Sequence, residues 1–418
     1  MSLHLSVRDI GLHFGDDTAQ LGIALARFLT TLDRPPLLLA LGEPTHGVEM
    51  FPRLRNQMLA YLVEHHGFRS VAVESDCVAA LAVDDHVTTG RGDVDEVLAR
   101  GFSHGFGASP ANRELVMWLR DHNAGSDPSR HVRFYGFDAP LEMSGAPSPR
   151  ACLLTAHAYL TEHLGGGRVP HEGRALDALL GDDDAWANPE AIMNASRSVG
   201  DTREARTLRL MADDVIALFE VEAPGLRAAT SDTDFERASM FARTAQGLLR
   251  YHAAMASSSP GRVEHMLGLR DAMMAANLLA VARAEADRGP CLVFAHNAHL
   301  QRHRSQWELA GMDLRWWSAG AITATALRDR YIFIASDFGD ATSSAASQAD
   351  PDNLQTVLSH ATPDRAIFPA QPLSAALGRH PRLRARADAD PGYFPLDPGL
   401  LDGMDAVAFI KIAERAPA

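Results

Sequence analysis

Lysine is almost absent from this sequence. Lys411 is the single lysine among 39 lysines and arginines, and it lies in an apolar run near the end of the chain. A Schiff-base mechanism needs a lysine amine beside its substrate, so this chemistry is nearly excluded. A phosphate-binding loop of the GxxxxGK[ST] type is absent as well.

Cysteine is also scarce. Cys77, Cys152 and Cys291 are scattered along the chain and form no CxxC pair. This pattern excludes a disulfide framework and a thiolate zinc cluster. It fits a reducing compartment, and we therefore expect a cytoplasmic protein.

Positive charge and long apolar runs are lacking too. The formal net charge of -14 argues against nucleic acid or an anionic membrane as a partner, because both attract basic surfaces. No stretch approaches about 18 uninterrupted apolar residues, and no basic, apolar signal segment opens the chain. With 46% hydrophobic and 22% charged residues, the composition is that of a globular protein with a large core. We expect a small-molecule substrate as the partner.

What the sequence does contain is a short apolar run that ends in polar residues. The run 37–41 stops at Gly42, and Glu43 and His46 follow within the segment GEPTH. This pattern predicts a buried parallel strand with a loop at its C-terminal end. Ligands of open α/β sheets bind at that end, where a carboxylate and an imidazole can transfer a proton.

The strand pattern recurs and sets the expected fold class. We predict an α/β protein with a mostly parallel central sheet flanked by helices, and a helical insertion that forms one wall of an active-site cleft. The predicted parts are a first α/β segment at 1–150, the insertion at 151–288, and a second α/β segment at 289–418. Residues 1–35 predict a helix, and 340–400 is expected to be mostly loop. Further strands are expected at 69–75, 131–140, 290–300, 330–338 and 405–413.

Polar side chains follow several of these strands. Because parallel strands bring their carboxyl ends to one edge of a sheet, we expect these side chains to share one crevice. Asp138, beside Pro140, could instead cap a turn. The residues are Glu43, His46, Glu74, Asp138, His296 and His299.

Three other features each have two interpretations. Arg55 could point into the crevice as a cationic clamp, or could pair with Glu49 on the surface. Trp316 and Trp317 are expected to form core or pocket wall. The stretch 101–105 matches G-x-S-x-G, but that motif works only on a strand-to-helix elbow. Here it follows the helical segment DVDEVLAR, so we discount a serine nucleophile.

The order and spacing of six stretches resemble the erythromycin esterase family. They are LLLALGEPTHG, HHGFRSVAVES, NRELVMWLRDHN, VRFYGFDAP, RDAMMAANLL and VFAHNAHL, and the resemblance covers most of residues 36–340. It implies hydrolysis of an ester or macrolactone without a covalent serine intermediate. A macrolide or another polyketide-like ester is the implied substrate, in antibiotic resistance or in natural-product metabolism.

The resemblance also implies roles for individual residues. His46 would be the base that activates water, and Glu74 would assist it. The other implied catalytic residues are Glu43, Arg55 and His296, and we expect His299, Asp138 and Trp317 to bind substrate.

Two rival mechanisms use the same cluster. In one, a divalent metal ion replaces the general base by activating its own bound water, although no HExxH helix is present. Its ligands would be Glu43, His46, Glu74, His296 and His299. The preferred mechanism needs no cofactor. In the other rival, the scaffold catalyses acyl transfer, cyclisation or elimination, or only sequesters a ligand.

Overall fold

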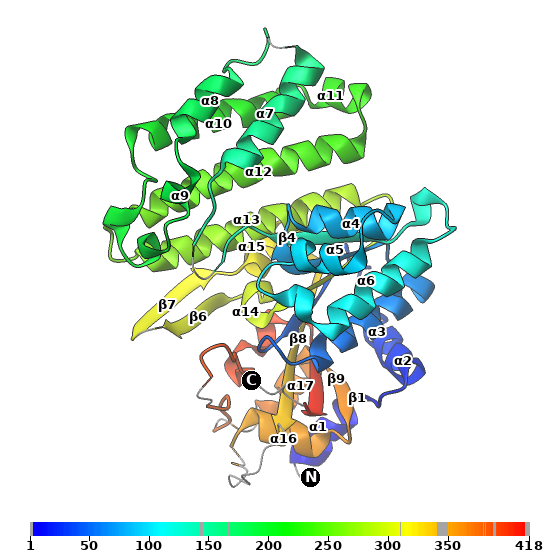
Figure 1. Ribbon diagram of the computed structural model, residues 1–418. Helices are drawn as coiled ribbons and strands as arrows, with labels where there is room; N and C mark the ends of the chain where they lie inside the picture. The colour runs from blue at the N-terminus through cyan, green and yellow to red at the C-terminus, as the bar shows by residue number, and fades with distance from the viewer. Residues whose placement is uncertain are drawn as a thin grey trace.

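An eight-stranded sheet forms the core of the computed structural model (Figure 1). The structure describes residues 3–142, 145–165, 167–309, 311–340, 350, 352–378, 380, 382–387 and 390–413. Across the sheet the strands are β1 (Leu12–Phe14), β9 (Arg365–Pro369), β10 (Ala406–Ile412), β8 (Tyr331–Asp340), β2 (Leu38–Glu43), β5 (Cys291–His296), β3 (Ser70–Asp76) and β4 (Arg133–Asp138). From β10 to β4 all neighbours are parallel, whereas β9 is antiparallel to β10 and to β1. The expected mostly parallel sheet is confirmed.

The central strands are apolar because both of their faces are covered. In β2, Leu39 and Leu41 join the hydrophobic cluster on one face, and Leu38 and Ala40 join the cluster on the other. Successive side chains of a strand point to opposite faces, so a strand between two helical layers needs apolar residues at almost every position. This is why such strands are recognisable as runs in the sequence.

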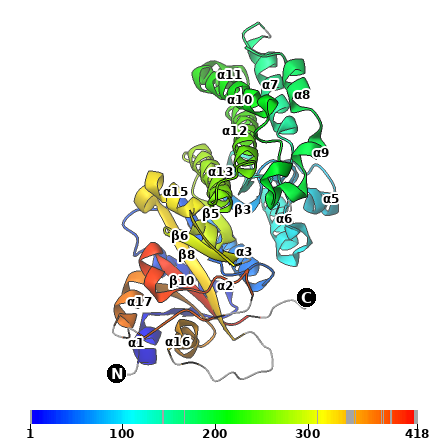
Figure 2. The same ribbon diagram turned by 90° about the vertical axis from the view of Figure 1, so that its left-hand side faces the viewer.

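Helices cover the sheet on both sides (Figure 2). One layer contains α2 (Thr18–Leu29), α3 (Met50–His65), α4 (Ala80–Thr89), α5 (Val94–Gly101) and α6 (Pro110–Asn123). The other contains α1 (Leu3–Ile10), α13 (Arg262–Ala284), α15 (Ala319–Leu327), α16 (Leu354–Ala361) and α17 (Ala370–Leu377). None of the helices within the described ranges is long and apolar enough to cross a membrane.

A group of helices with its own hydrophobic cluster is stacked above the sheet (Figures 1 and 2). Its helices are α7 (Arg150–Leu164), α8 (Gly173–Leu180), α9 (Asp183–Trp186), α10 (Arg203–Val221), α11 (Ala223–Ala229) and α12 (Asp232–Met255). The helix α12 packs along α13, and α13 packs on the sheet through Met274, Leu278 and Val281. One helix therefore contacts both the sheet and the helical region.

The structure corrects several expectations about single elements. The expected helix at 1–35 is two helices separated by the short strand β1. A polar hairpin, β6 (Arg304–Leu309) and β7 (Met312–Trp317), was not predicted, and WWSAGAITA continues into α15. The segment 340–400, expected to be mostly loop, contains α16, β9 and α17; its part 341–349 lies outside the described residues. The predicted strands β2 and β3 are parallel, but β5 lies between them.

Candidate active site

A cavity of about 600 Å³ opens at the carboxyl ends of β2 and β3. A volume of this size holds one drug-sized ligand. It lies at the edge where the sequence predicts a crevice. Its polar lining includes Glu43, His46, Arg55, Glu74 and His104, and its apolar lining includes Phe102, Phe106 and Phe294.

His46, in the loop after β2, is held by Glu43. Its Nδ1 lies 2.8 Å from Glu43 Oε1, and its Nε2 lies 3.8 Å from Glu74 Oε1. Burial alone would lower the pKa of His46. The charge of Glu74 and the hydrogen bond to Glu43 outweigh that effect and raise the pKa to about 9. At neutral pH the imidazole of the free protein is therefore mostly protonated, although its side chain is 41% exposed.

Glu74, at the end of β3, accepts interactions from four neighbours. Its Oε1 lies 3.3 Å from Arg270 Nη2, 3.5 Å from His299 Nε2 and 3.8 Å from His46 Nε2. Its Oε2 accepts the backbone N–H of His296 at 2.8 Å. Burial favours the neutral carboxyl, but the surrounding charges hold the pKa of Glu74 well below its usual range. Glu74 is therefore the anion on which the cluster converges.

A second carboxylate–imidazole pair also reaches Glu74. His299 lies on α14 (Asn297–Leu300), and its Nδ1 is 2.7 Å from Oδ1 of the buried Asp271. The other oxygen of Asp271 accepts Trp316 Nε1–H at 3.1 Å and the N–H of Ala319 at 3.0 Å. Burial would lower the pKa of His299, but the charges of Asp271 and Glu74 raise it. Asp271 thereby fixes the ring with Nε2 toward Glu74.

His296, at the end of β5, uses both ring nitrogens within the protein. Its Nε2–H donates to the carbonyls of Pro44 at 3.0 Å and Gly392 at 3.2 Å, and its Nδ1 accepts the N–H of Ala298 at 3.2 Å. Burial and the nearby charge of His46 lower its pKa to about 3, so the ring is neutral. His296 ties the His46 loop to β5, and its catalytic role stays a prediction.

Asp138, at the end of β4, is fully buried and anchors the side chains of Arg270 and His104. Arg270 Nη2 lies 2.6 Å from its Oδ2, and His104 Nε2 lies 3.0 Å from the same oxygen. Despite burial, these two neighbours lower the pKa of Asp138. His104 adopts a φ of 56° and bonds through Nδ1 to Glu142 at 2.9 Å. The carboxylate of Asp138 therefore positions Arg270 beside Glu74.

Arg55 lines the cavity and does not form the surface pair considered from the sequence. It is 1% exposed, and its Cζ lies 4.9 Å from the ring centre of Phe294. Its Nε and Nη2 donate to Asn56 Oδ1 at 3.0 and 2.8 Å. Burial lowers its pKa to about 10. Glu49, the alternative partner, instead accepts the N–H of Ala111 at 3.0 Å.

The structure does not bring Trp317 to the cluster. Its side chain is 55% exposed on the hairpin, and the guanidinium of Arg304 lies 5.6 Å from its ring. The neighbouring Trp316 points the other way, is buried, and contacts Asp271. Substrate binding by Trp317 stays a prediction that this placement does not favour.

Ser103, the serine of the G-x-S-x-G match, makes hydrogen bonds that hold a loop in place. Its Oγ accepts the N–H of Asp76 at 3.0 Å, and its own N–H donates to Ser75 Oγ at 2.9 Å. It follows α5 and not a strand, so the geometry of a nucleophile elbow is not formed. Ser103 instead holds the loop that carries His104 against β3.

The metal-dependent alternative requires the histidine and carboxylate side chains of the cluster to converge on one point. Within the described part of the chain, no group of three or more His, Cys, Asp or Glu side chains is arranged to hold a metal ion. The nitrogen and oxygen donors of the cluster are directed at one another, as in the pairs His46–Glu43 and His299–Asp271. The metal-dependent alternative therefore remains a prediction for experiment.

Comparison with known proteins identifies the family. The sequence model described as erythromycin esterase matches residues 63–410. This chain belongs to the erythromycin esterase family. The matched range includes Glu74, Arg270 and His299, whereas Glu43 and His46 lie before its start.

One named relative of this erythromycin esterase family member is distant in sequence. Erythromycin esterase type I from Escherichia coli is 24% identical over 277 residues, which are 66% of this chain and 64% of that protein. The match thus spans less than two thirds of that relative's length.

Solved structures show the same fold at low sequence identity. A Bacillus cereus protein has a TM-score of 0.74 at 16% identity, over 99% of this chain and 98% of its own. A succinoglycan biosynthesis protein has a TM-score of 0.73 at 15% identity, over 99% and 97%. A mutant of the erythromycin esterase EreC in its open conformation has a TM-score of 0.65 at 18% identity, over 96% and 95%.

Three residues of the cluster were not predicted as site residues. Arg270 and Asp271 are adjacent on α13, and His104 lies inside the discounted serine motif. A usable signal was the Arg-Asp pair at the start of RDAMMAANLL, because a helix face otherwise rich in Ala, Met and Leu buries charges only in pairs. Asp271 and Asp138 show this pairing through their bonds to His299 and Arg270.

Proposed function

We propose that this protein hydrolyses an ester or a macrolactone by direct attack of water, with His46 as the general base. The observation that carries the proposal is the orientation of His46, whose Nδ1 is fixed by Glu43 while Nε2 faces Glu74 in the cavity. Membership of the erythromycin esterase family and the E. coli relative support an ester of the macrolide type as the substrate.

In the proposed reaction, water gives a proton to His46 Nε2 while its oxygen bonds to the carbonyl carbon. Glu74 stabilises the imidazolium that forms, and Glu43 keeps the ring oriented, as a carboxylate does in a catalytic triad. The imidazolium then returns the proton to the alkoxide as the ester C–O bond breaks, which yields an acid and an alcohol. General-base assistance of this kind is worth about 10²–10⁴-fold.

Arg55 is the proposed donor to the oxyanion of the tetrahedral intermediate. It lines the same cavity, and burial leaves its cation poorly solvated, which strengthens its attraction to a developing negative charge. Loss of one such donor typically lowers kcat by about 10²–10³-fold.

The raised pKa of His46 gives this mechanism a characteristic pH dependence. Only the neutral imidazole accepts a proton, and with a pKa of about 9 it is the minor form at neutral pH. The rate constant kcat/KM should therefore rise about tenfold per pH unit below that pKa and level off above it. An enzyme whose rate is flat from pH 6 to 9 would not use His46 as this base.

The direct test is His46→Asn with His65→Asn as a matched control, because His65 ends the helix α3 and is exposed. Purified variants are incubated with a panel of macrolides and simple esters and followed by mass spectrometry. We expect a water-addition product with wild type and the control and none with His46→Asn, while all three proteins remain folded. Turnover by His46→Asn at the wild-type rate would refute the proposal, and loss of water or no mass change with every ester would favour the non-hydrolytic alternatives.

A further inference from the structure

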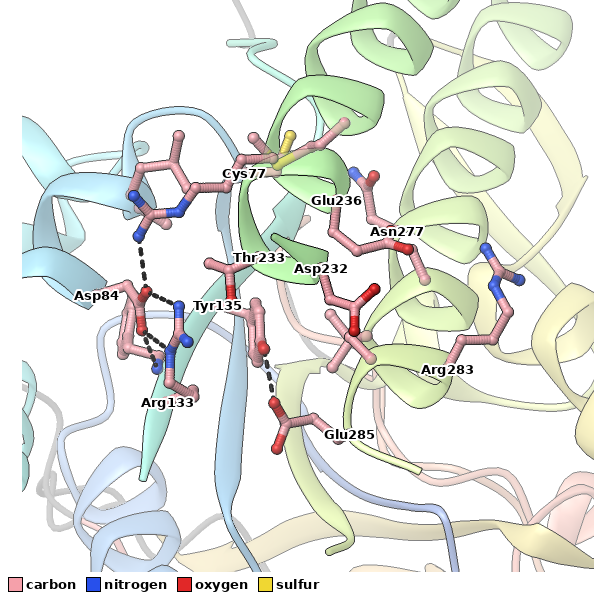
Figure 3. Close-up of a pocket in the computed structure, with 18 of the residues that line it drawn as sticks. Cys77, Asp84, Arg133, Tyr135, Asp232, Thr233, Glu236, Asn277, Arg283 and Glu285 are labelled. Carbon is pink, nitrogen blue, oxygen red and sulfur yellow. Dashed lines mark hydrogen bonds and ion pairs between the residues drawn. The ribbon is translucent and has the colours of Figure 1, made fainter. Parts of the chain in front are cut away.

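A second cavity, of about 540 Å³, lies between the edge of the sheet and the stacked helices (Figure 3). Its lining comes mainly from α4, β4, α12 and α13, and it shares no residue with the cavity of the candidate active site. Part of its wall is apolar, including Leu81, Phe134, Met240 and Val281. It is large enough for one small molecule.

Most charged side chains around this second cavity neutralise one another (Figure 3). Asp84, labelled in the figure, accepts Arg133 Nε–H at 2.8 Å, and Glu285 accepts the hydroxyl of Tyr135 at 2.7 Å. The remaining pairs are Arg237 with Asp84 and Asp85, Arg227 with Asp232 and Glu236, and Arg288 with Glu285. Among the residues that line the second cavity, an arginine without a carboxylate partner is therefore unusual.

Two arginines are exceptions. Arg243, on α12, has no ion pair or hydrogen bond to any residue that the structure describes, and its Nε is buried. Arg283, near the end of α13, is exposed and also lacks such a partner within the described ranges, as does the lining carboxylate of Asp287. Burial lowers the pKa of Arg243, the nearby charge of Glu236 raises it, and the charge of Arg283 lowers it by a smaller amount. The side chain of Arg243 is partly buried and its Nε–H has no hydrogen-bond partner among the described residues, so an anion bound in the cavity would supply the guanidinium with one.

We propose that the second cavity binds a small molecule that carries one oxyanion, a carboxylate or a phosphate, on an apolar body. The forked N–H groups of Arg243 and Arg283 match the oxygen geometry of either anion. The apolar wall around Met240 and Val281 would contact the body of the ligand. The site is distinct from the candidate active site, so its occupation is measurable without any assay of hydrolysis.

The test measures binding by calorimetry with hexanoate, hexyl phosphate, hexanol and inorganic phosphate. Arg243→Met keeps an unbranched apolar stem and removes the guanidinium with its charge, and Arg250→Met is the control, because Arg250 is exposed on the same helix. We expect wild type and the control to bind at least one of the two hexyl anions, and Arg243→Met to lose at least tenfold in affinity. The hexyl anion that binds more tightly identifies the head group as carboxylate or phosphate. Weaker binding of hexanol and of inorganic phosphate would show that the anionic head and the apolar body both contribute to affinity.

Three outcomes would overturn the proposal: no binding of either hexyl anion to wild type, equal binding to Arg243→Met, or hexanol binding as tightly as hexanoate. The ligand-free proteins give an independent readout. Removal of a partly buried charge that has no ion pair with any described residue should leave the Tm of Arg243→Met equal to that of wild type or higher. A clear fall in Tm would show that Arg243 is a structural partner and would contradict its assignment. Arg283→Met, at an exposed position, repeats the binding test without risk to the fold.

Discussion

Replacement of Glu74 by Gln should lower the pKa of His46, because the charge of Glu74 is the largest single contribution that raises that pKa. His46 Nε2 and Glu74 Oε1 are 3.8 Å apart, and Coulomb's law at an effective dielectric constant of about 20 gives about 4 kcal/mol at that distance. At about 1.36 kcal/mol per pKa unit, this corresponds to about three units.

Solvent reduces this figure. The side chain of His46 is 41% exposed, so water screens part of the interaction, and we expect a fall of about one to two units from the wild-type value of about 9. The hydrogen bond from His46 to Glu43 is unchanged by the substitution and keeps the pKa of the variant above that of a free histidine.

The assay is an NMR titration of protein labelled in its histidine rings, with His46→Asn used to assign the signal of His46. The rising limb of kcat/KM against pH should move to lower pH by the same amount, while its plateau falls because the imidazolium has lost its stabilising anion. Glu142→Gln serves as the control, since Glu142 bonds to His104 and not to His46. An unchanged or higher pKa of His46 in Glu74→Gln would refute the electrostatic argument.

Four further predictions follow from described contacts. Asp271→Ala leaves the buried indole N–H of Trp316 without its acceptor, which should lower the free energy of unfolding in urea by about 1–3 kcal/mol or more. Gly42→Ala places a methyl group 2.1 Å from Asn297 Oδ1, so it should cost about 1–3 kcal/mol in the same assay, and no change would contradict the packing. Dialysis against a chelator should leave hydrolysis intact, and restoration by added metal after a loss would favour the metal-dependent alternative. The raised pKa of His46 adds stability that is present below pH 6.5 and lost as pH rises through about 9, so the urea midpoint should fall across that window.

Buried strands were predictable from the sequence because helices cover them on both faces, which makes them apolar at consecutive positions. The hairpin β6–β7 was not predicted because it is largely exposed. Charged residues such as Arg304, Glu308 and Arg315 interrupt the apolar run that would indicate a strand. The strand order could not be predicted at all. Nothing in the local sequence of β2 or β3 records that β5 lies between them.

The candidate site was predictable where its residues follow strands and not where they lie on helices. Glu43, Glu74 and Asp138 end apolar runs, and the structure places them along one edge of the sheet. Arg270 and Asp271 interrupt no apolar run, so the available signal is their charge on a helix face rich in Ala, Met and Leu, and that signal does not identify the partners of the two charges. Trp316 contacts the cluster and Trp317 does not. Adjacent residues of a strand face opposite sides, so only one of the two side chains can reach the cluster.

The position of β5 in the sheet also constrains how the protein is made. Leu38 of β2 and Ser70 of β3 both pair with Cys291, which is translated only after the whole helical region. Until then the facing edges of two apolar strands have no partner, and unpaired strand edges promote association between chains. Pairing across so long a stretch of chain is also intrinsically slow. The cluster of the candidate site therefore assembles late in synthesis, and a nascent chain that stalls before β5 is the species most exposed to aggregation and to capture by chaperones.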